Sequence, residues 1–151
     1  MVQIRVSAER VLDAPAEVVY HCIADYREHH RPEGFLPPAF TDFEVQRRGV
    51  GAGTVIRFAS TLGGRKQAMT AAIEELEPGR VLVETGHPVR TTFTVEPEGR
   101  RARVRFDTVI EAGGFVGLVT RLFAPRMLRP LYEDELSRLE RYAQLHPPLT
   151  N

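Results

Sequence analysis

Several residue types that mark particular classes of protein are scarce or missing in this chain. It has one cysteine, Cys22, and no tryptophan. A single thiol excludes an internal disulfide and a cysteine-based zinc site, and it fits a reducing compartment. No apolar run approaches the roughly 18 residues that cross a bilayer, and the N-terminus lacks the basic and apolar regions of a secretory signal. We therefore expect a cytoplasmic protein with no integral membrane segment.

An excess of charge of either sign is also missing. The 20 basic residues balance the 20 acidic ones, and Lys66 is the single lysine among them. Proteins that bind nucleic acid or anionic membranes usually carry a basic surface. The balance predicts that nucleic acid is not a partner, and we interpret the dominance of arginine as the codon bias of a GC-rich genome.

What the chain does contain is enough apolar sequence for one folded domain. It has 151 residues, of which 42% are hydrophobic and 26% are charged. A chain of this length buries roughly 70% of its unfolded surface, so a core forms without metal ions or disulfides. No repeat or linker divides the sequence. We predict a single domain over residues 1–151, with room for an internal cavity.

Hydrophobic periodicity predicts a strand and then a helix at the start of the chain. Apolar residues alternate over 2–12, which is typical of a strand with one buried face. A helix is predicted over 16–25, with Asp13 as its cap and Pro15 in its first turn. The polar, proline-rich segment 27–38 has room for a second short helix before a loop.

Six extended runs and a long helical segment follow. The predicted strands are 40–47, 54–62, 66–76, 80–85, 89–96 and 103–111. The short glycine and proline links between them make neighbouring strands antiparallel. One face of this sheet is expected to be polar and to carry Arg57, Arg90 and Asp107. From 115 to about 144 the period is helical, and Pro125 and Pro130 predict a kink in that helix.

Several short motifs resemble those of a known superfamily. LDAPAEVVY at 12–20, followed by ADY at 24–26, looks like the opening of the START-like superfamily, in particular its polyketide cyclase/dehydrase and lipid-transport branch. GAGT at 51–54, ELEPGR at 75–80 and LSRLE at 136–140 match it further. The resemblance implies an α+β helix-grip fold. In that fold two short helices follow the first strand, and a curved seven-stranded antiparallel sheet grips the long C-terminal helix.

The resemblance also implies a deep apolar cavity between sheet and helix, which the family uses for lipids, hormones, polyketides and quinones and, in some members, for catalysis. We expect the following residues to contact a ligand there: Ile56, Phe58, Leu62, Phe93, Phe106, Phe115, Leu118, Leu122 and Phe123. The resemblance places the Gly86-His87-Pro88 turn at the cavity mouth. His87 is therefore a candidate ligand contact and the one candidate acid or base, unless it is simply a solvent-exposed turn residue.

Other chemistry has little support in the sequence. The glycines at 49–53 precede a strand rather than a helix, so we interpret them as turn residues and not as a nucleotide loop. His29 and His30 are adjacent and are typical of an exposed polar segment, whereas His21 and Cys22 are interpreted as packing residues of the first helix. No spacing typical of metal ligands is evident, and we expect neither a metal ion nor a cofactor.

Three functions of different classes are compatible with these residues. The first is a carrier or sensor that binds a small hydrophobic or amphipathic molecule resembling a lipid, polyketide or quinone. The second is a polyketide cyclase, aromatase or dehydratase that uses the same cavity to direct an aldol step. The third is a protein-interaction module without a ligand, which a collapsed cavity would favour. The sequence leaves open whether the chain forms a homodimer.

Overall fold

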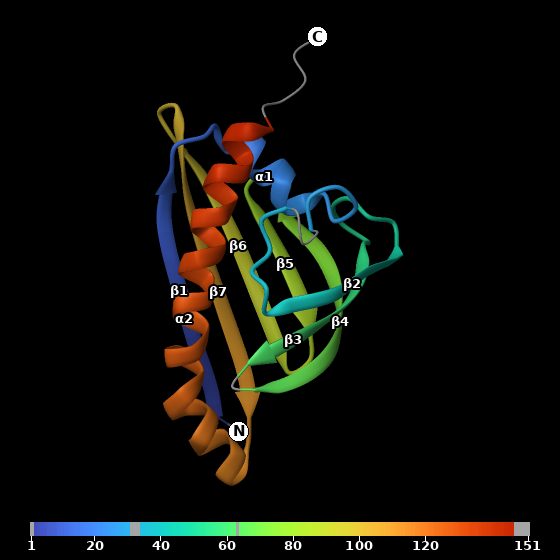
Figure 1. The fold of residues 1–151 in the computed structure, drawn as a ribbon, viewed down its shortest axis with the longest axis vertical. Coiled ribbons are helices and arrows are strands. Elements are labelled where there is room, and N and C mark those ends of the chain that lie inside the picture. Colours follow the sequence, from blue (N-terminus) through green and yellow to red (C-terminus); the bar gives the residue numbers. More distant parts are fainter. Residues whose placement is uncertain (1, 31–33, 63, 147–151) are drawn as a thin grey trace.

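The described part of the chain folds into one curved antiparallel sheet and two helices (Figure 1). The computed structural model describes residues 2–30, 34–62 and 64–146, and for 2, 115, 116 and 118 only the backbone. The strands are β1 (Val2–Leu12), β2 (Phe40–Arg47), β3 (Val55–Leu62), β4 (Arg65–Glu77), β5 (Val81–Gly86), β6 (Val89–Glu98) and β7 (Arg101–Ala112). The helices are α1 (Ala16–Ala24) and α2 (Gly114–Leu145).

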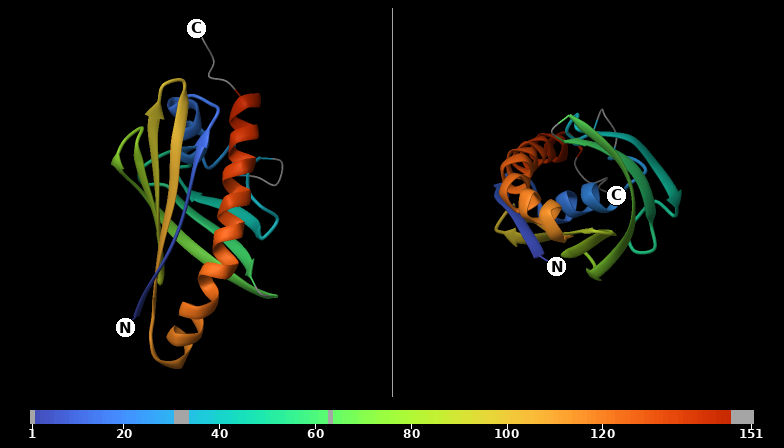
Figure 2. Two further views of the ribbon diagram at one scale, coloured as in Figure 1. Left: turned by 90° about the vertical axis from the view of Figure 1, so that its left-hand side faces the viewer. Right: turned by 90° about the horizontal axis from the view of Figure 1, so that it is seen from below.

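The sheet has seven strands in the order β1-β7-β6-β5-β4-β3-β2, and each neighbouring pair is antiparallel. β1 and β2 therefore lie at opposite edges, although they are consecutive in sequence. Figure 2 shows the sheet curving around α2. Alternate residues of β7, such as Val104, Phe106 and Thr108, are buried on the concave side, as the period-2 pattern predicts. The predicted seven-stranded sheet and long C-terminal helix are thereby confirmed.

Helix α1 starts without the predicted side-chain cap. Its N-cap residue is Pro15, whose carbonyl accepts hydrogen bonds from the backbone N–H groups of Val18 and Val19. Asp13 lies two residues before the cap position, so its carboxylate does not cap the helix. Its backbone N–H instead donates a 2.7 Å hydrogen bond to the carboxylate of Glu140 on α2. The start of α1 is thus fixed against the C-terminal half of α2.

Only one short helix follows β1 in the described residues, where the sequence predicted two. Beyond Ala24 the Asp25 carboxylate accepts hydrogen bonds from the backbone N–H groups of Arg27 and Glu28, each 3.1 Å long. Such side-chain bonds to the backbone compete with helical ones and favour a turn. Residues 26–29 accordingly form a turn, and the predicted second helix is wrong for the part of this segment that the structure describes.

Helix α2 is a single α-helix of 32 residues that continues through Pro125 and Pro130. Its axis leans in the N-terminal half, as Figure 2 shows, which agrees with the bend that the prolines predict. From its middle onward the helix buries Leu128, Leu136 and Leu139 in the core. Neither α1 nor α2 is long and apolar enough to cross a membrane.

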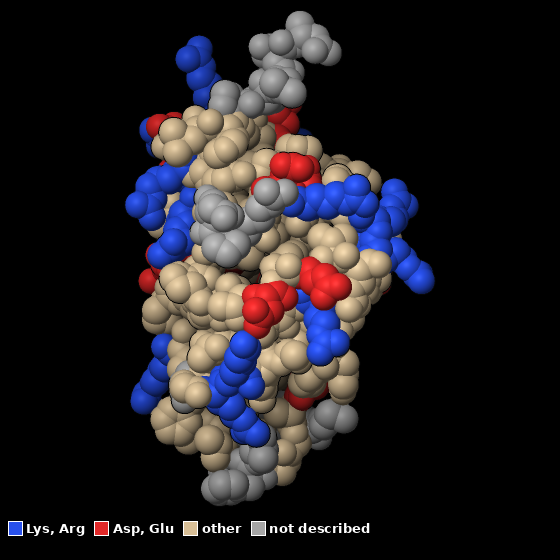
Figure 3. All heavy atoms as spheres, turned by 45° about the vertical axis from the view of Figure 1, so that its right-hand side comes forward, with Lys and Arg blue, Asp and Glu red and all other residues tan. Residues whose placement is uncertain are grey.

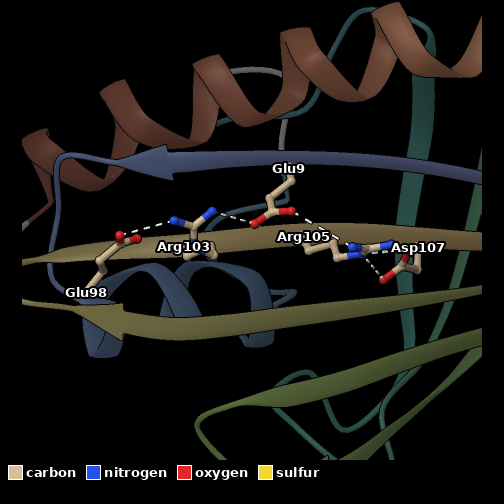
Figure 4. A network of polar contacts seen from close by, with 5 residues as sticks. All are labelled: Glu9, Glu98, Arg103, Arg105 and Asp107. Atoms are coloured by element: carbon tan, nitrogen blue, oxygen red, sulfur yellow. Dashed lines mark hydrogen bonds and ion pairs between the residues drawn. The ribbon is translucent and has the colours of Figure 1, made fainter.

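The convex face of the sheet carries a row of ion pairs (Figure 4). Arg103 contacts Glu9 at 2.7 Å and Glu98 at 3.1 Å, and Arg105 donates to both carboxylate oxygens of Asp107. Exposed pairs of this kind contribute little to stability, because water and salt screen them. Their main effect is to keep this face of the sheet in water.

The remaining charged residues agree with a polar outer surface. Arg57 and Arg90 are exposed and Asp107 is half-buried, and none of the three lines the cavity described below. The expected polar face is therefore confirmed. On the side of the molecule drawn in Figure 3, basic and acidic side chains are interspersed, in keeping with the balanced charge.

Candidate functional site

A cavity of about 670 Å³ lies between the concave face of the sheet and α2. Cavities of roughly 300–1,000 Å³ are typical of small-molecule sites. Its wall is mainly aromatic and aliphatic, and the segment between α1 and β2 contributes Phe35 and Leu36 to it. The molecule thus encloses an apolar space large enough for a small organic ligand.

Most of the residues that the sequence selected for this site do meet around the cavity. The lining includes five of them from the sheet and one from α2, namely Ile56, Phe58, Leu62, Phe93, Phe106 and Phe123. Phe93 and Phe106 pack edge to face, with ring centroids 4.8 Å apart. Phe123 is 51% exposed, so this part of the wall reaches the surface of the molecule.

Two of the selected residues, Leu122 and His87, do not line the cavity, and the side chains of two others are not described. Leu122 is 60% exposed and does not line the cavity, because neighbouring positions on a helix point about 100° apart and Phe123 takes the inward direction. His87 is exposed and does not line the cavity, although Gly86 and Pro88 on either side of it do. His87 lies in the two-residue turn between β5 and β6, where its side chain is exposed. The side chains of Phe115 and Leu118 lie outside the described residues.

A buried carboxyl group, Glu84, projects into the cavity from β5. The hydroxyl of Tyr26, which follows α1, donates a 2.6 Å hydrogen bond to its Oε1 atom. Burial raises the pKa of Glu84 to about 7, and the hydrogen bond from Tyr26 opposes that rise. Near neutral pH the Glu84 carboxyl therefore exchanges readily between its acid and base forms.

A second buried carboxyl, Glu135, reaches the same cavity from α2. Burial is the main cause that raises its pKa, to about 8, and the negative charges of Glu84 and Asp134 add to it. Glu135 therefore holds its proton at neutral pH more firmly than Glu84 does. Within the described part of the chain its carboxyl has no hydrogen-bond partner. No fully buried side-chain nitrogen or oxygen among the described residues lacks a partner, so the carboxyl oxygens of Glu135 face the open space of the cavity, where a ligand can reach them.

His30 is also buried at the cavity, which corrects the interpretation of His29 and His30 as an exposed pair. Its ring stacks on Tyr26 with centroids 4.1 Å apart, and its Nε2–H donates a 2.8 Å hydrogen bond to the carbonyl of Ile23. Burial lowers the pKa of His30 to about 4, so the ring is neutral at physiological pH. His29 is half-buried beside it.

Three hydroxyl groups form a short chain across the cavity wall. The Oγ1 atoms of Thr91 and Thr108 are 2.9 Å apart, and Thr108 Oγ1 lies 2.6 Å from the hydroxyl of Tyr132. Burial raises the pKa of Tyr132 to about 12, so its hydroxyl stays protonated. All three residues line the cavity and can exchange hydrogen bonds with a ligand's oxygen atoms.

This combination of fold and cavity can be compared with known proteins. Residues 3–144 match the family model described as polyketide cyclase / dehydrase and lipid transport. The chain belongs to this family. No curated protein sequence matches it.

Solved structures place this polyketide cyclase/dehydrase family member among helix-grip proteins. The NMR structure of KanY protein (ms6282) is 25% identical, with a TM-score of 0.80 over 95% of this chain and 99% of that chain. TTHA0849 from Thermus thermophilus is 24% identical, with a TM-score of 0.75 over 93% of this chain and 97% of that chain. The Zhui aromatase/cyclase from Streptomyces sp. R1128 is 15% identical, with a TM-score of 0.70 over 95% of this chain and 94% of that chain.

Sequence reasoning missed the polar residues of this family member's cavity, although two of them carry a local signal. In β5, Glu84 lies two residues after the buried Leu82, so the two side chains point to the same, concave face. Glu135 lies four residues from both Leu131 and Leu139, on the apolar stripe of α2. A charged residue on an apolar stripe is the pattern that would have identified both carboxyls.

Proposed function

We propose that this protein binds a small, mainly apolar molecule carrying at least one carbonyl or hydroxyl group, as a carrier or sensor. The supporting observation is the Glu135 carboxyl, which is buried, protonated at neutral pH and without a partner among the described residues at the wall of an apolar cavity. The apolar part of the ligand contacts residues such as Phe58 and Phe106. Its oxygen accepts a hydrogen bond from the protonated Glu135 carboxyl, whose oxygens face the cavity.

The class of ligand follows from the chemistry of the wall. Aromatic rings line the cavity, and the polar atoms among them are mostly hydroxyls and carboxyls. Arg65, at one end of β4, is the sole Lys or Arg in the described lining, so the wall holds little positive charge for a strongly anionic ligand. A polyketide, quinone or lipid with spaced oxygen atoms has the required mixture of apolar surface and hydrogen-bonding groups.

A second function, acid–base catalysis on a polyketide-like substrate, is favoured by one observation. Glu84 and Glu135 line the same cavity with different proton affinities, and such a pair supplies a base and an acid. The Glu84 carboxylate takes a proton from a methylene group between two carbonyls, and the resulting carbanion attacks a ketone carbon of the same chain. Glu135 gives its proton to the new alkoxide. Water is then lost, because Glu84 gives its proton to the departing hydroxyl and Glu135 takes a proton from the substrate carbon. Both carboxyls thereby return to their starting protonation states.

The third candidate, an interaction module without a ligand, has less support. A collapsed cavity would favour it, whereas the cavity here is open. A homodimer and a cytoplasmic location stay predictions from the sequence.

The binding proposal is tested by replacing a small cavity-lining residue of β4 with a large one that fills the cavity. Ala71 on β4 is 2% exposed and lines the cavity, whereas the next residue, Ala72, is exposed on the opposite face. The neutral apolar fluorescent probe Nile red is titrated into the wild type and the Ala71→Phe and Ala72→Phe variants. We expect Ala71→Phe to weaken probe binding at least tenfold and Ala72→Phe to bind like the wild type. Equal affinities in the two variants would contradict the proposal.

Catalysis is tested separately from binding. Glu84→Gln keeps the size of the side chain and removes the base, so turnover of a poly-β-ketone substrate should fall by roughly 10²- to 10⁴-fold while substrate binding persists. Unchanged turnover in Glu84→Gln, or no turnover in the wild type, would reject the catalytic function and leave the carrier function.

A further inference from the structure

A cluster of two histidines and one aspartate lies on the outer side of the α1 end. His21, Asp25 and His29 each offer one ligand atom, and these atoms all lie within 4.8 Å of one another. The three residues are spaced four apart along the chain. Helix α1 ends at Ala24 and Asp25 is extended, but a 3.3 Å hydrogen bond from the backbone N–H of His29 to the carbonyl of Asp25 closes a turn, and the centroid of the His29 ring lies 5.5 Å from that of His21.

The carboxylate of Asp25 is fixed in the middle of this cluster. Its Oδ1 atom accepts the backbone N–H groups of Arg27 and Glu28, and its Oδ2 atom lies 3.7 Å from Nε2 of His21. One oxygen is thus occupied by the turn and the other is directed at an imidazole. This division between a structural and a ligating oxygen is what a carboxylate needs to hold a cation in a defined position.

His29 is held by α2. Its Nδ1 atom lies 2.5 Å from the hydroxyl of Tyr142, and the two rings pack edge to face. When Nδ1–H donates to that hydroxyl, Nε2 keeps a free lone pair. Histidines that bind metal ions almost always donate their other ring proton in this way, which fixes the orientation of the ring.

We propose that His21, Asp25 and His29 form a binding site for a divalent transition-metal ion such as Zn²⁺, with water in the remaining coordination position. Two imidazoles and one carboxylate are a ligand set that zinc accepts, at about 2.0–2.2 Å from each atom. Ligand atoms around such an ion are about 3.3 Å apart, and a small rotation of the exposed His21 side chain closes the remaining gap.

The sequence predicted no metal ion because His29 and His30 are adjacent and His21 and His87 are far apart in the chain. The spacing of four residues between His21, Asp25 and His29 is the one that brings ligand atoms within 4.8 Å of one another.

This site is distinct from the cavity but connected to it. The turn of residues 26–29 leads directly to His30, which lines the cavity, and it begins with Tyr26, the hydrogen-bond donor to Glu84. A bound ion would join α1, this turn and, through Tyr142, the C-terminal end of α2. It would therefore rigidify the segment that holds the polar end of the ligand site.

The experiment uses the untagged full chain after treatment with a chelator, because an affinity tag rich in histidine would itself bind the metal. Zinc affinity is measured by competition with a chromogenic chelator, and the thermal midpoint is recorded with and without zinc. We expect one zinc ion per chain and a rise in the midpoint. His21→Ala should weaken binding at least tenfold, while His87→Ala, at an exposed histidine outside the cluster, should bind like the wild type.

Two further variants keep the test decisive. His21 has a side chain that is 64% exposed, so its replacement leaves the fold intact even if His29→Ala does not fold. Tyr142→Phe keeps all three ligands and removes the hydroxyl that orients His29, so affinity should fall about 10- to 100-fold. The proposal would be overturned if the wild type bound no zinc, or if His21→Ala and His87→Ala bound it equally well.

Discussion

The Tyr26 hydroxyl donates a 2.6 Å hydrogen bond to the Glu84 carboxyl, joining the segment after α1 to strand β5 at the cavity wall. The bond stabilises the charged form of Glu84 against the effect of burial, which raises its pKa. Glu135 has no such donor among the described residues. Glu84 and Glu135 therefore differ in their protonation at neutral pH, because Glu84 has a tyrosine donor while the negative charges of Glu84 and Asp134 raise the pKa of Glu135.

Removal of this hydroxyl should make Glu84 a weaker acid. In Tyr26→Phe we expect the pKa of Glu84 to rise further and the free energy of unfolding to fall by about 1–3 kcal/mol, since a buried carboxyl loses its donor. NMR titration of the carboxyl carbons measures the pKa. Tyr20→Phe is the matched control, because its 2.7 Å hydrogen bond is to Glu75, which does not line the cavity. A Glu84 pKa that is the same in wild type and Tyr26→Phe would contradict this assignment.

Stability should fall as the pH rises from about 5 to 8. Glu135 has an ordinary pKa of 4.5 in the unfolded chain and a pKa of about 8 in the folded one, so over this range only the unfolded chain has lost the proton. Each such group lowers the free energy of unfolding by up to about 1.4 kcal/mol per pH unit. Glu84 acts in the same direction up to about pH 7. Burial of the neutral His30 acts oppositely, with stability lost as the pH falls from 6.5 to about 4.

Glu135→Gln isolates one of these contributions. It removes the titrating group and keeps its size, so urea denaturation at pH 5, 6, 7 and 8 should give a shallower fall than in the wild type. An identical pH dependence for the two proteins would show that Glu135 does not titrate as described.

An apolar side chain at position 135 should stabilise the fold while impairing the site. Glu135→Leu removes a carboxyl whose pKa burial raises to about 8, and we expect the free energy of unfolding at neutral pH to rise by about 1–3 kcal/mol. Binding of oxygen-containing ligands should weaken at the same time. Glu133→Leu, at an exposed position of the same helix, should change stability by less than about 0.5 kcal/mol. A less stable Glu135→Leu variant would mean that the carboxyl is structurally satisfied.

The single domain predicted from the sequence implies one cooperative unfolding transition. Circular dichroism at a helical and a strand wavelength should give the same thermal midpoint. Two separated transitions in the monomer would contradict a single domain.

The fold was predictable because its signals are local. Alternation and glycine or proline turns located all seven strands within about two residues, and the 40–47 strand was predicted with its observed bounds. The helix α2 was predicted through its prolines because its apolar stripe continues on both sides of them. Each of these patterns can be read from a short window of sequence.

The site was less predictable because its contacts join distant segments. Tyr26 and Glu84 are 58 residues apart in sequence, and Thr108 and Tyr132 are 24 apart. His30 was misjudged because its polar neighbours suggested solvent, whereas stacking on Tyr26 buries it. The apolar wall could be predicted from strand parity, but the partners of its polar groups depend on how the segments pack.

The most direct test of the central claim is native mass spectrometry of the untagged wild-type protein purified from its own host, beside Ala71→Phe and Ala72→Phe. We expect the wild type and Ala72→Phe to carry a non-covalent molecule of a few hundred daltons, a size that the cavity accommodates. Ala71→Phe should have the mass of the bare chain. The bare mass for all three proteins, or the same bound mass on all three, would contradict a ligand held in this cavity.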